Sequence, residues 1–296
     1  MITVMTPTYN RAYILEKAYT SLKSQTSFDF EWIVVDDGSS DDTEAVVKKW
    51  AAEENNFKIT YEKQKNGGKH RAINKGVSLA RYDYFLILDS DDRLTENAVE
   101  TVHRWIKDID GLEGFAGVMG LKSDNSGVSG GVPPQKYIDA TNLERKKYGL
   151  LGEKAEIYKT EILRKYPFPE FEGENFLRES AVWNRIAIDG YKLRWFSEVI
   201  YLFEYVGDGL TKNTTFETCA KNFQGHTYCT KLHLQTVTGL LYYYKCGEFY
   251  KIASLKKISF RKARKILNVS SFSMMIGIFV FHIRNVYIKF FKKNGR

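Results

Sequence analysis

The stretch YFLILDSDD at residues 84–92 decides the expected fold, because an apolar run of strand length leads directly into four polar residues. Such a run suits a strand buried on both faces, and a parallel sheet delivers the carboxyl end of that strand to the edge where ligands bind. The carboxylates of Asp89, Asp91 and Asp92 would repel one another there unless a cation lay among them, and hard oxygen ligands of this kind suit Mg²⁺ or Mn²⁺. The alternative is an acidic turn before a helix that begins near Thr95.

Upstream of this stretch, the chain repeats a pattern of strand, polar turn and helix. Strands are expected at residues 2–5, 31–37 and 57–63, followed by turns that read TPTYNR, GSSDD and NGGKH. Alternating strands and helices of this length predict βαβ units and a mostly parallel α/β sheet flanked by helices. The carboxyl ends of all four strands should then lie on one side, so that their polar turns form a single site. Pro7 and Asn10 are expected to end the first strand.

Two common phosphate-binding motifs are missing from the sequence. No GxGxxG follows the first strand, which disfavours a dinucleotide-binding fold of the usual kind, and no GxxxxGK[ST] occurs, which excludes a P-loop. A nucleotide would therefore be held by carboxylates and a metal.

The composition of the chain changes at Gly114. A strand is expected over GFAGVMGL, then a mobile loop, and after the stretch EKAEIYK further strands are expected over KLRWF and VIYLFEYV. The aromatic turn YPFPEFEGENF at 166–176 leads into a helix that begins near Arg178 or Glu179, because its prolines exclude a helix within the turn. Beyond Thr214 the chain is expected to be helical.

The charge is divided unevenly along the chain. The formal net charge of the chain is +8. Residues 245–296 alone carry +12, because they contain thirteen Lys or Arg and one acid, Glu248, and this leaves about −4 for residues 1–244. Residues 1–244 are mildly acidic and contain no recognisable motif for reading a nucleic-acid sequence. Both observations argue against a nucleic-acid partner, despite the positive net charge of the whole chain.

Cys219, Cys229 and Cys246 are too few and too irregularly spaced for a disulfide framework or a structural zinc site, so a reducing interior is the expected compartment. His226, Cys229 and His233 would share one face of a helix and could in principle bind a metal. Packing on a helix face is the favoured interpretation, because no acidic partner accompanies them. The opening MITVMTPTYN has neither a basic leader nor an apolar run of signal-peptide length, which predicts that the protein is not exported.

Taken together, the polar turns resemble glycosyltransferase family 2, whose members have the GT-A fold and invert the configuration of the transferred sugar. The GGKH form of the third turn particularly resembles bacterial capsule and surface-polysaccharide transferases. The resemblance covers roughly residues 1–200, in the family's order. Its motifs are TPTYNR at 6–11, VVDDGSSDDT at 34–43, NGGKHRAINKG at 66–76, LDSDD at 88–92 and RESAVWNRI at 178–186.

The resemblance implies a binding site for a UDP-sugar. Asp89, Ser90 and Asp91 match the DxD motif, in which the second acid typically binds Mn²⁺ or Mg²⁺ and the first faces the ribose or sugar beside the metal. Asp92 is then expected to be a helix-start residue, and Lys69 is expected near the nucleotide. The residues implied around the uracil and ribose are Thr6, Pro7, Tyr9, Asp36 and Asp37.

The catalytic base departs from the family pattern. The family usually has an Asp preceded by Glu, four residues before a Trp and six before an Arg. Counting back from Trp183 and Arg185 leads to Glu179, preceded here by Arg178, so the implied base is a Glu with a longer reach. Displacing UDP from an anomeric carbon needs a cation for the leaving diphosphate and a carboxylate for the acceptor proton, and these residue types supply both. The alternative for Glu179 is a helix-start acid favoured by the macrodipole.

The resemblance therefore implies an inverting, metal-dependent hexosyltransferase that moves a sugar from a UDP-sugar to a lipid-linked or oligosaccharide acceptor in surface polysaccharide biosynthesis. The alternative is a catalytically inactive nucleotide-sugar or saccharide-binding subunit of an assembly complex, which the Glu179 departure suggests. The expected domains are residues 1–212, divided into a nucleotide-binding half at 1–112 and an acceptor-binding half at 113–212, and a helical basic region at 213–296.

The basic, aromatic end of the chain predicts contact with a membrane surface. Between Val269 and Ile283 only about fifteen residues lack a formal charge, which is fewer than the ~20 apolar residues that a spanning helix needs. Aromatic and basic flanks favour an interfacial segment, and hence a cytoplasmic protein that is peripheral on the inner face of the cell membrane. The alternative is an ordinary pair of core helices with solvated lysines.

Overall fold

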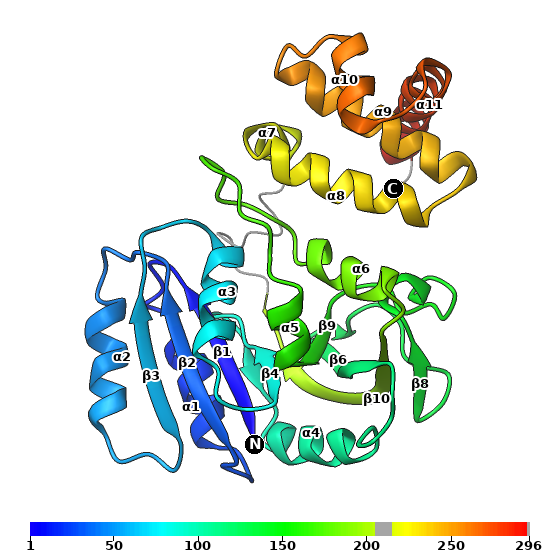
Figure 1. The fold of residues 1–296 in the computed structure, drawn as a ribbon. Helices are drawn as coiled ribbons and strands as arrows, with labels where there is room; N and C mark the ends of the chain where they lie inside the picture. Colours follow the sequence, from blue (N-terminus) through cyan, green and yellow to red (C-terminus); the bar gives the residue numbers. More distant parts are fainter. Residues whose placement is uncertain (205–214, 295–296) are drawn as a thin grey trace. The chain divides into compact units, whose positions relative to one another are not determined.

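The computed structural model describes residues 1–204 and 215–294 and divides the chain into two compact units (Figure 1). The first unit comprises Met1–Phe168 and Val182–Gly207, and the second comprises Pro169–Ala181 and Asp208–Arg296. The aromatic turn at 166–176 is therefore divided, because its first three residues belong to the first unit and the rest to the second. The predicted domain boundary between residues 212 and 213 lies outside the described residues.

A sheet forms the centre of the first unit. Its main path follows the order β3-β2-β1-β4-β9-β6-β10-β5, with β7 paired to β6 and β8 paired to β10. The strands are β1 (Ile2–Thr8), β2 (Phe30–Asp36), β3 (Lys58–Lys63), β4 (Tyr84–Ile87), β5 (Arg93–Leu94), β6 (Phe115–Asp124), β7 (Gly127–Val128), β8 (Tyr137–Ala140), β9 (Lys154–Lys159) and β10 (Lys192–Leu202).

The four strands β3, β2, β1 and β4 run parallel, as predicted. Every residue of β1 and β2 is buried, which matches central strands covered on both faces. Strand β9 runs antiparallel to both β4 and β6, so the complete sheet is mixed. The carboxyl ends of the four parallel strands still share one edge, which is the feature that positions the site.

Strand β1 continues through Pro7 to Thr8, so the expectation that Pro7 ends the strand is wrong. Pairing with β4 stops at Met5, whereas pairing with β2 runs on to Thr8. At Pro7 the strand is therefore paired on one side only, a position that tolerates a residue without a backbone N–H. Asn10, with a φ of 52°, lies beyond the strand in the turn.

The strand expected over KLRWF and the first four residues of VIYLFEYV form one strand, β10, which ends at Leu202. The last two residues of VIYLFEYV lie outside the described residues. Strand β10 runs parallel to β6 with register shifts, one of them between Trp195 and Val199. Such local irregularities let the strand pass the polar pair Ser197 and Glu198 without ending. The loop predicted to be mobile contains the short strand β7.

Helices of the first unit lie against the sheet (Figure 1). In α4 the buried residues recur at helical spacing, and its Trp105 stacks on Phe196 of β10 with ring centroids 4.5 Å apart. Gly120 of β6 permits this contact, because a Cβ there would lie 2.6 Å from the Trp105 ring. The helices are α1 (Glu16–Lys23), α2 (Thr43–Ala52), α3 (Lys69–Leu79), α4 (Ala98–Lys107), the 3₁₀ turn Asn142–Glu144, α5 (Thr160–Lys165) and α6 (Ser180–Ile188), whose first two residues belong to the second unit.

The second unit is helical and has a core of its own, which includes Cys246, Phe249 and Met274. Helices α9 and α11 touch at two glycines, because a Cβ on Gly247 would lie 2.0 Å from the carbonyl oxygen of Gly277. Helix α11 thus packs on α9 at Gly277, as in the alternative of a core helix pair. The helices are α7 (Phe216–Lys221), α8 (Phe223–Thr236), α9 (Gly239–Leu255), α10 (Phe260–Leu267) and α11 (Ser271–Asn294).

Candidate active site

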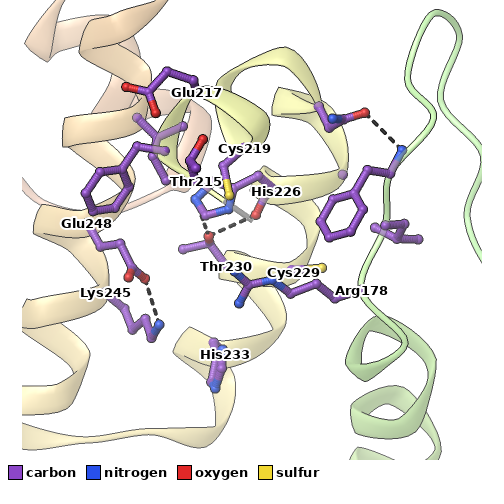
Figure 2. Close-up of a pocket in the computed structure, with 16 residues that line it drawn as sticks. Arg178, Thr215, Glu217, Cys219, His226, Cys229, Thr230, His233, Lys245 and Glu248 are labelled. Carbon is purple, nitrogen blue, oxygen red and sulfur yellow. Dashed lines mark hydrogen bonds and ion pairs between the residues drawn. The ribbon is translucent and has the colours of Figure 1, made fainter. Parts of the chain in front are cut away.

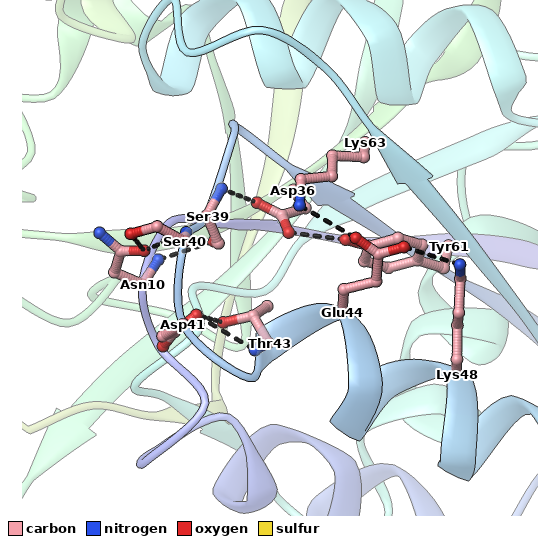
Figure 3. Close-up of polar contacts among 10 residues, drawn as sticks. All are labelled: Asn10, Asp36, Ser39, Ser40, Asp41, Thr43, Glu44, Lys48, Tyr61 and Lys63. Carbon is pink, nitrogen blue, oxygen red and sulfur yellow. Dashed lines mark hydrogen bonds and ion pairs between the residues drawn. The ribbon is translucent and has the colours of Figure 1, made fainter.

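Polar contacts link the four turns at the carboxyl ends of β1, β2, β3 and β4. The Asn10 N–H donates to Ser39 Oγ at 2.8 Å, which joins the first turn to the second (Figure 3). Asp37 joins the second turn to the third through the bonds described below. Lys69 Nζ lies 2.6 Å from Asp89 Oδ1, which joins the third turn to the fourth. The four turns therefore form one connected site, as predicted.

Asp37 holds the glycine-rich third turn by its buried carboxylate. Its Oδ1 accepts hydrogen bonds from Gly67 N–H at 2.9 Å and Gln64 Nε2 at 2.7 Å, and its Oδ2 accepts one from Gly68 N–H at 2.7 Å. Bonds to a charged acceptor of this kind are stronger than neutral ones. Gly68 has a φ of 98°, a conformation that favours glycine, and it immediately precedes α3. These hydrogen bonds from the third turn to Asp37 therefore fix the start of α3, with Lys69, at the site.

Asp36 is fully buried at the end of β2, and both of its carboxylate oxygens have partners (Figure 3). Oδ2 accepts from the Tyr61 hydroxyl at 2.6 Å, and Oδ1 accepts from Ser39 N–H at 2.7 Å. Burial, together with the charge of Asp36, raises the pKa of Tyr61 far above its ordinary value, so the phenol remains a donor. A carboxylate offers about four lone-pair sites, so the two hydrogen bonds leave acceptor capacity on Asp36.

The first turn offers fewer side chains than its sequence suggests. The Thr6 hydroxyl accepts a hydrogen bond from Trp32 Nε1 at 2.9 Å inside the core, and Thr6 as a whole is fully buried. Pro7 is buried. Tyr9 is 49% exposed, which leaves its ring accessible for stacking. The Thr8 hydroxyl, which the sequence did not single out, is buried without a hydrogen-bond partner in the described part of the chain.

Asp89, Ser90 and Asp91 lie together in the loop after β4, with Ser90 buried and the two carboxylates partly exposed. Burial alone would raise the pKa of Asp89, but the ammonium groups of Lys69 and Lys122 hold it below its ordinary value. Burial, and then the charge of Asp89, raises the pKa of Asp91. A cation close to both carboxylates would stabilise their ionised forms.

The donor set of this loop fits a hard divalent cation that binds together with a ligand. Within residues 1–204 and 215–294, no cluster of three or more His, Cys, Asp or Glu side chains is arranged to hold a metal. Mg²⁺ is commonly held by one or two carboxylates plus substrate phosphate oxygens, and Mn²⁺ also prefers oxygen ligands. Asp91 and Asp89 therefore fit a metal that completes its shell on a diphosphate.

The support of this loop comes from residues that no local pattern identified. The Asp89 N–H donates to the Tyr201 hydroxyl at 2.9 Å, and the same hydroxyl hydrogen-bonds the Asp92 carboxylate. Lys122 Nζ lies 3.7 Å from the centre of the Tyr201 ring. Tyr201, Asp92 and Lys122 are all buried, and burial followed by the charge of Asp89 raises the pKa of Asp92 to about 7.

The interpretation of Asp92 as a helix-start residue is wrong, because α4 begins only at Ala98 and is preceded by Asn97 at the N-cap. The chain first forms the short strand β5, which pairs with β10 and brings Asp92 to Tyr201. Pairing with a distant strand thus decided the environment of this carboxylate.

Glu179, the predicted base, belongs to the second unit and immediately precedes α6. It is half-buried. Within the first unit, Trp183 of α6 stacks on Tyr158 of β9 with ring centroids 4.4 Å apart, which anchors the helix that follows Glu179. The position directly before a helix also fits the alternative of an acid favoured by the macrodipole.

A cavity of about 370 Å³ lies within the second unit (Figure 2). It is lined by Arg178, which precedes α6, and by residues of α7, α8 and α9, among them His226, Lys245 and Glu248. Lys245 Nζ pairs with Glu248 Oε2 at 2.7 Å. The His226 ring stacks on Phe249 with centroids 6.1 Å apart, and burial lowers the pKa of His226 to about 4. The aromatic contact agrees with helix-face packing for this histidine.

Residues 3–148 match the family model described as Glycosyl transferase family 2. This part of the chain carries β1 to β4 and the four linked turns. Residues 3–148 therefore form a glycosyltransferase family 2 domain.

Two bacterial relatives are similar over part of their length. The GalNAc(5)-diNAcBac-PP-undecaprenol beta-1,3-glucosyltransferase of Campylobacter jejuni is 30% identical over 191 residues, which cover 62% of this chain and 58% of that protein. Glycosyltransferase GlyG of Streptococcus pneumoniae is 33% identical over 110 residues, which cover 37% of this chain and 36% of that protein. The chain thus spans between about a third and somewhat over half of the length of these relatives.

Two solved structures are similar in fold. Staphylococcus aureus TarS 1–349 in complex with UDP-GlcNAc has a TM-score of 0.62 at 18% identity, covering 95% of this chain and 89% of that one. The mannosyltransferase PcManGT of Pyrobaculum calidifontis in complex with GDP-Man and Mn²⁺ has a TM-score of 0.54 at 18% identity, covering 96% of this chain and 75% of that one. The predicted GT-A fold, an α/β sheet flanked by helices with a helical C-terminal region, is confirmed.

Proposed function

We propose that this protein is a glycosyltransferase that moves a sugar from a UDP-sugar to a saccharide acceptor in surface polysaccharide synthesis. The observation that carries the proposal is the 2.6 Å contact between Lys69 and Asp89. This pair lies beside Asp91 and next to the third turn, which Asp37 holds by hydrogen bonds. It gathers an ammonium group and two carboxylates at the carboxyl ends of parallel strands, where ligands of such sheets bind. TarS, which shares the fold, has been solved with UDP-GlcNAc.

On the donor side, we propose a role for each residue of the four turns. Tyr9, whose ring is exposed, would contact the uracil or ribose directly, and Thr6, Pro7, Asp36 and Asp37 would form the buried wall around that nucleoside site. Lys69 would neutralise part of the diphosphate charge, and Ser90 would line the same loop. Asp91 and Asp89 would hold Mn²⁺ or Mg²⁺, which supplies electrostatic stabilisation of the leaving diphosphate.

On the acceptor side, Glu179 is proposed as the general base. The acceptor oxygen forms a bond to the anomeric carbon while the bond from that carbon to UDP breaks, and the hydroxyl proton passes to the Glu179 carboxylate. Attack from the face opposite UDP inverts the configuration at the anomeric carbon. A metal-dependent, inverting hexosyl transfer is thus proposed.

For the acceptor, we propose a lipid-linked saccharide. The name of the Campylobacter jejuni relative describes an acceptor linked to undecaprenol through a diphosphate. A lipid-linked acceptor would require the protein to work at a membrane, and we propose the inner face of the cell membrane, with the protein cytoplasmic and peripheral.

The test is a panel of UDP-sugars, each incubated with the purified protein, Mn²⁺ and a bacterial membrane extract, with release of UDP as the measurement. We expect one or a few donors to release UDP in a manner that depends on the extract. UDP-sugar binding without any turnover over the whole panel would instead indicate the catalytically inactive binding subunit.

A further inference from the structure

Helix α11 has two apolar sides, and one of them is packed within the second unit. Met274, Gly277 and Phe281 lie on this side and are buried. Gly277 meets Gly247 of α9 at a distance that only glycines allow. This side therefore completes the core of the unit and fixes α11 to α9.

The opposite side of α11 carries a row of exposed apolar side chains, which we call the α11 stripe. At about 100° of rotation and about 1.5 Å of rise per residue, the stripe falls within an arc of roughly 80° and extends over about 21 Å. Each of its side chains is between 50% and 66% exposed. A helix that packs on the protein core with one side and faces only water with the other carries polar side chains on the second side. The stripe consists of Phe272, Met275, Phe279, Ile283 and Val286.

The chain around the stripe is positively charged. Residues 249–296 contain twelve Lys or Arg and no Asp or Glu. On the preceding helix α10, Arg261, Lys262 and Lys265 are exposed. Exposed cationic side chains next in sequence to an exposed apolar row are typical of helices that lie in a membrane interface.

We infer that the α11 stripe is a docking surface for an anionic lipid bilayer, with α11 in the plane of the interface. Among the described residues, no single helix is long and apolar enough to cross a membrane, and α10 and α11 reach that composition only as a pair bent by 104°. A helix in the plane buries one side in lipid and leaves the other packed on α9. The charge favours anionic lipid over a second copy of the chain, because two surfaces of the same sign repel each other. The inference does not depend on the proposed reaction.

The test is co-sedimentation of the full chain with vesicles of phosphatidylcholine, with and without anionic phosphatidylglycerol. The stripe variant replaces Phe279 and Ile283 by Gln, a helix-compatible residue that changes no charge. Its matched control replaces Ser271 and His282, which are exposed on the same helix outside the stripe, by Gln. We expect the parent and the control to bind anionic vesicles, and the stripe variant to bind at least about tenfold more weakly.

A second pair of variants tests the charge. Replacing Arg261, Lys262 and Lys265 by Gln should remove the preference for anionic vesicles, whereas replacing the exposed body lysines Lys49, Lys58 and Lys107 should not. Equal binding by the parent and the stripe variant, or no binding by the parent, would overturn the inference. So would a lower melting temperature of the stripe variant without lipid, because the stripe would then be covered within the protein. A parent dimer that the stripe variant converts to a monomer, without vesicle binding, would identify a second copy as the partner.

Discussion

Lys69 Nζ, at the first residue of α3, lies 2.6 Å from Asp89 Oδ1 in the loop after β4. The contact depends on Asp37, whose carboxylate binds the N–H groups of Gly67 and Gly68 and so fixes the start of α3. Because both partners of the pair are partly exposed, the pair itself adds little to stability. The pair matters for position, because it holds the Lys69 ammonium group beside the carboxylates proposed to hold the metal.

Replacing Asp91 by Asn should abolish metal-dependent transfer. The variant keeps the shape of the side chain but loses the charge that would bind Mn²⁺ or Mg²⁺, so we expect a rate loss of at least about 10²-fold. The measurement is the rate as a function of Mn²⁺ concentration. Asp110→Asn, an exposed position in the same unit, is the control and should behave as the parent. Full turnover by the parent in excess chelator would contradict the metal assignment.

Replacing Glu179 by Gln should keep UDP-sugar binding and lose about 10²–10⁴ in rate, the usual scale for a general base. Calorimetry would measure binding, and UDP release would measure turnover. Glu172→Gln, an exposed acid of the same segment, should leave both unchanged. If Glu179→Gln turns over normally, the base is another residue and Glu179 is a helix-start acid.

Replacing Tyr201 by Phe should loosen the loop that carries Asp89 and Asp91. The variant removes the hydroxyl that accepts from the Asp89 N–H, and an unsatisfied buried group of this kind costs about 1–3 kcal/mol of unfolding free energy. We also expect half-maximal activation to need more Mn²⁺ than in the parent. Tyr191→Phe is the control, because the Tyr191 hydroxyl contacts Lys165 in an exposed part of the unit. Lower stability with an unchanged Mn²⁺ requirement would show that Tyr201 stabilises the fold but does not affect metal binding.

Acid should destabilise the second unit through His226. Burial lowers the pKa of His226 to about 4 in the folded state, whereas an unfolded histidine has a pKa of about 6.5. Between these values the unfolded state binds more protons, so the stability present above pH 6.5 is lost as the pH falls toward 4, by up to ~3 kcal/mol. Urea unfolding at pH 7 and pH 4.5 should show a smaller loss in His226→Gln than in the parent. His282→Gln, at an exposed position, should lose as much as the parent, and equal losses in all three proteins would refute the role of His226.

The nucleotide-binding half of the fold could be predicted from the sequence because its signals are local. In β1 to β4, an apolar strand followed by a polar turn and a helix is visible over a short stretch of chain. The connections between such units force the strands to be parallel, which brings the turns that contain Asp36, Asp37, Lys69 and Asp89 to one edge. The exception is Pro7, whose place in β1 depends on where pairing with β4 stops.

Only the tertiary structure decided which distant residues support that edge and which side of the basic tail is buried. Tyr201 reaches Asp92 because β5 pairs with β10, and no periodicity in a single strand specifies its partner in the sheet. In α11 both sides are apolar, so hydrophobic periodicity could not choose between a core helix and an interfacial one. The close approach of Gly277 to Gly247 made the choice, because it turns one side of α11 into the core and leaves the stripe on the surface.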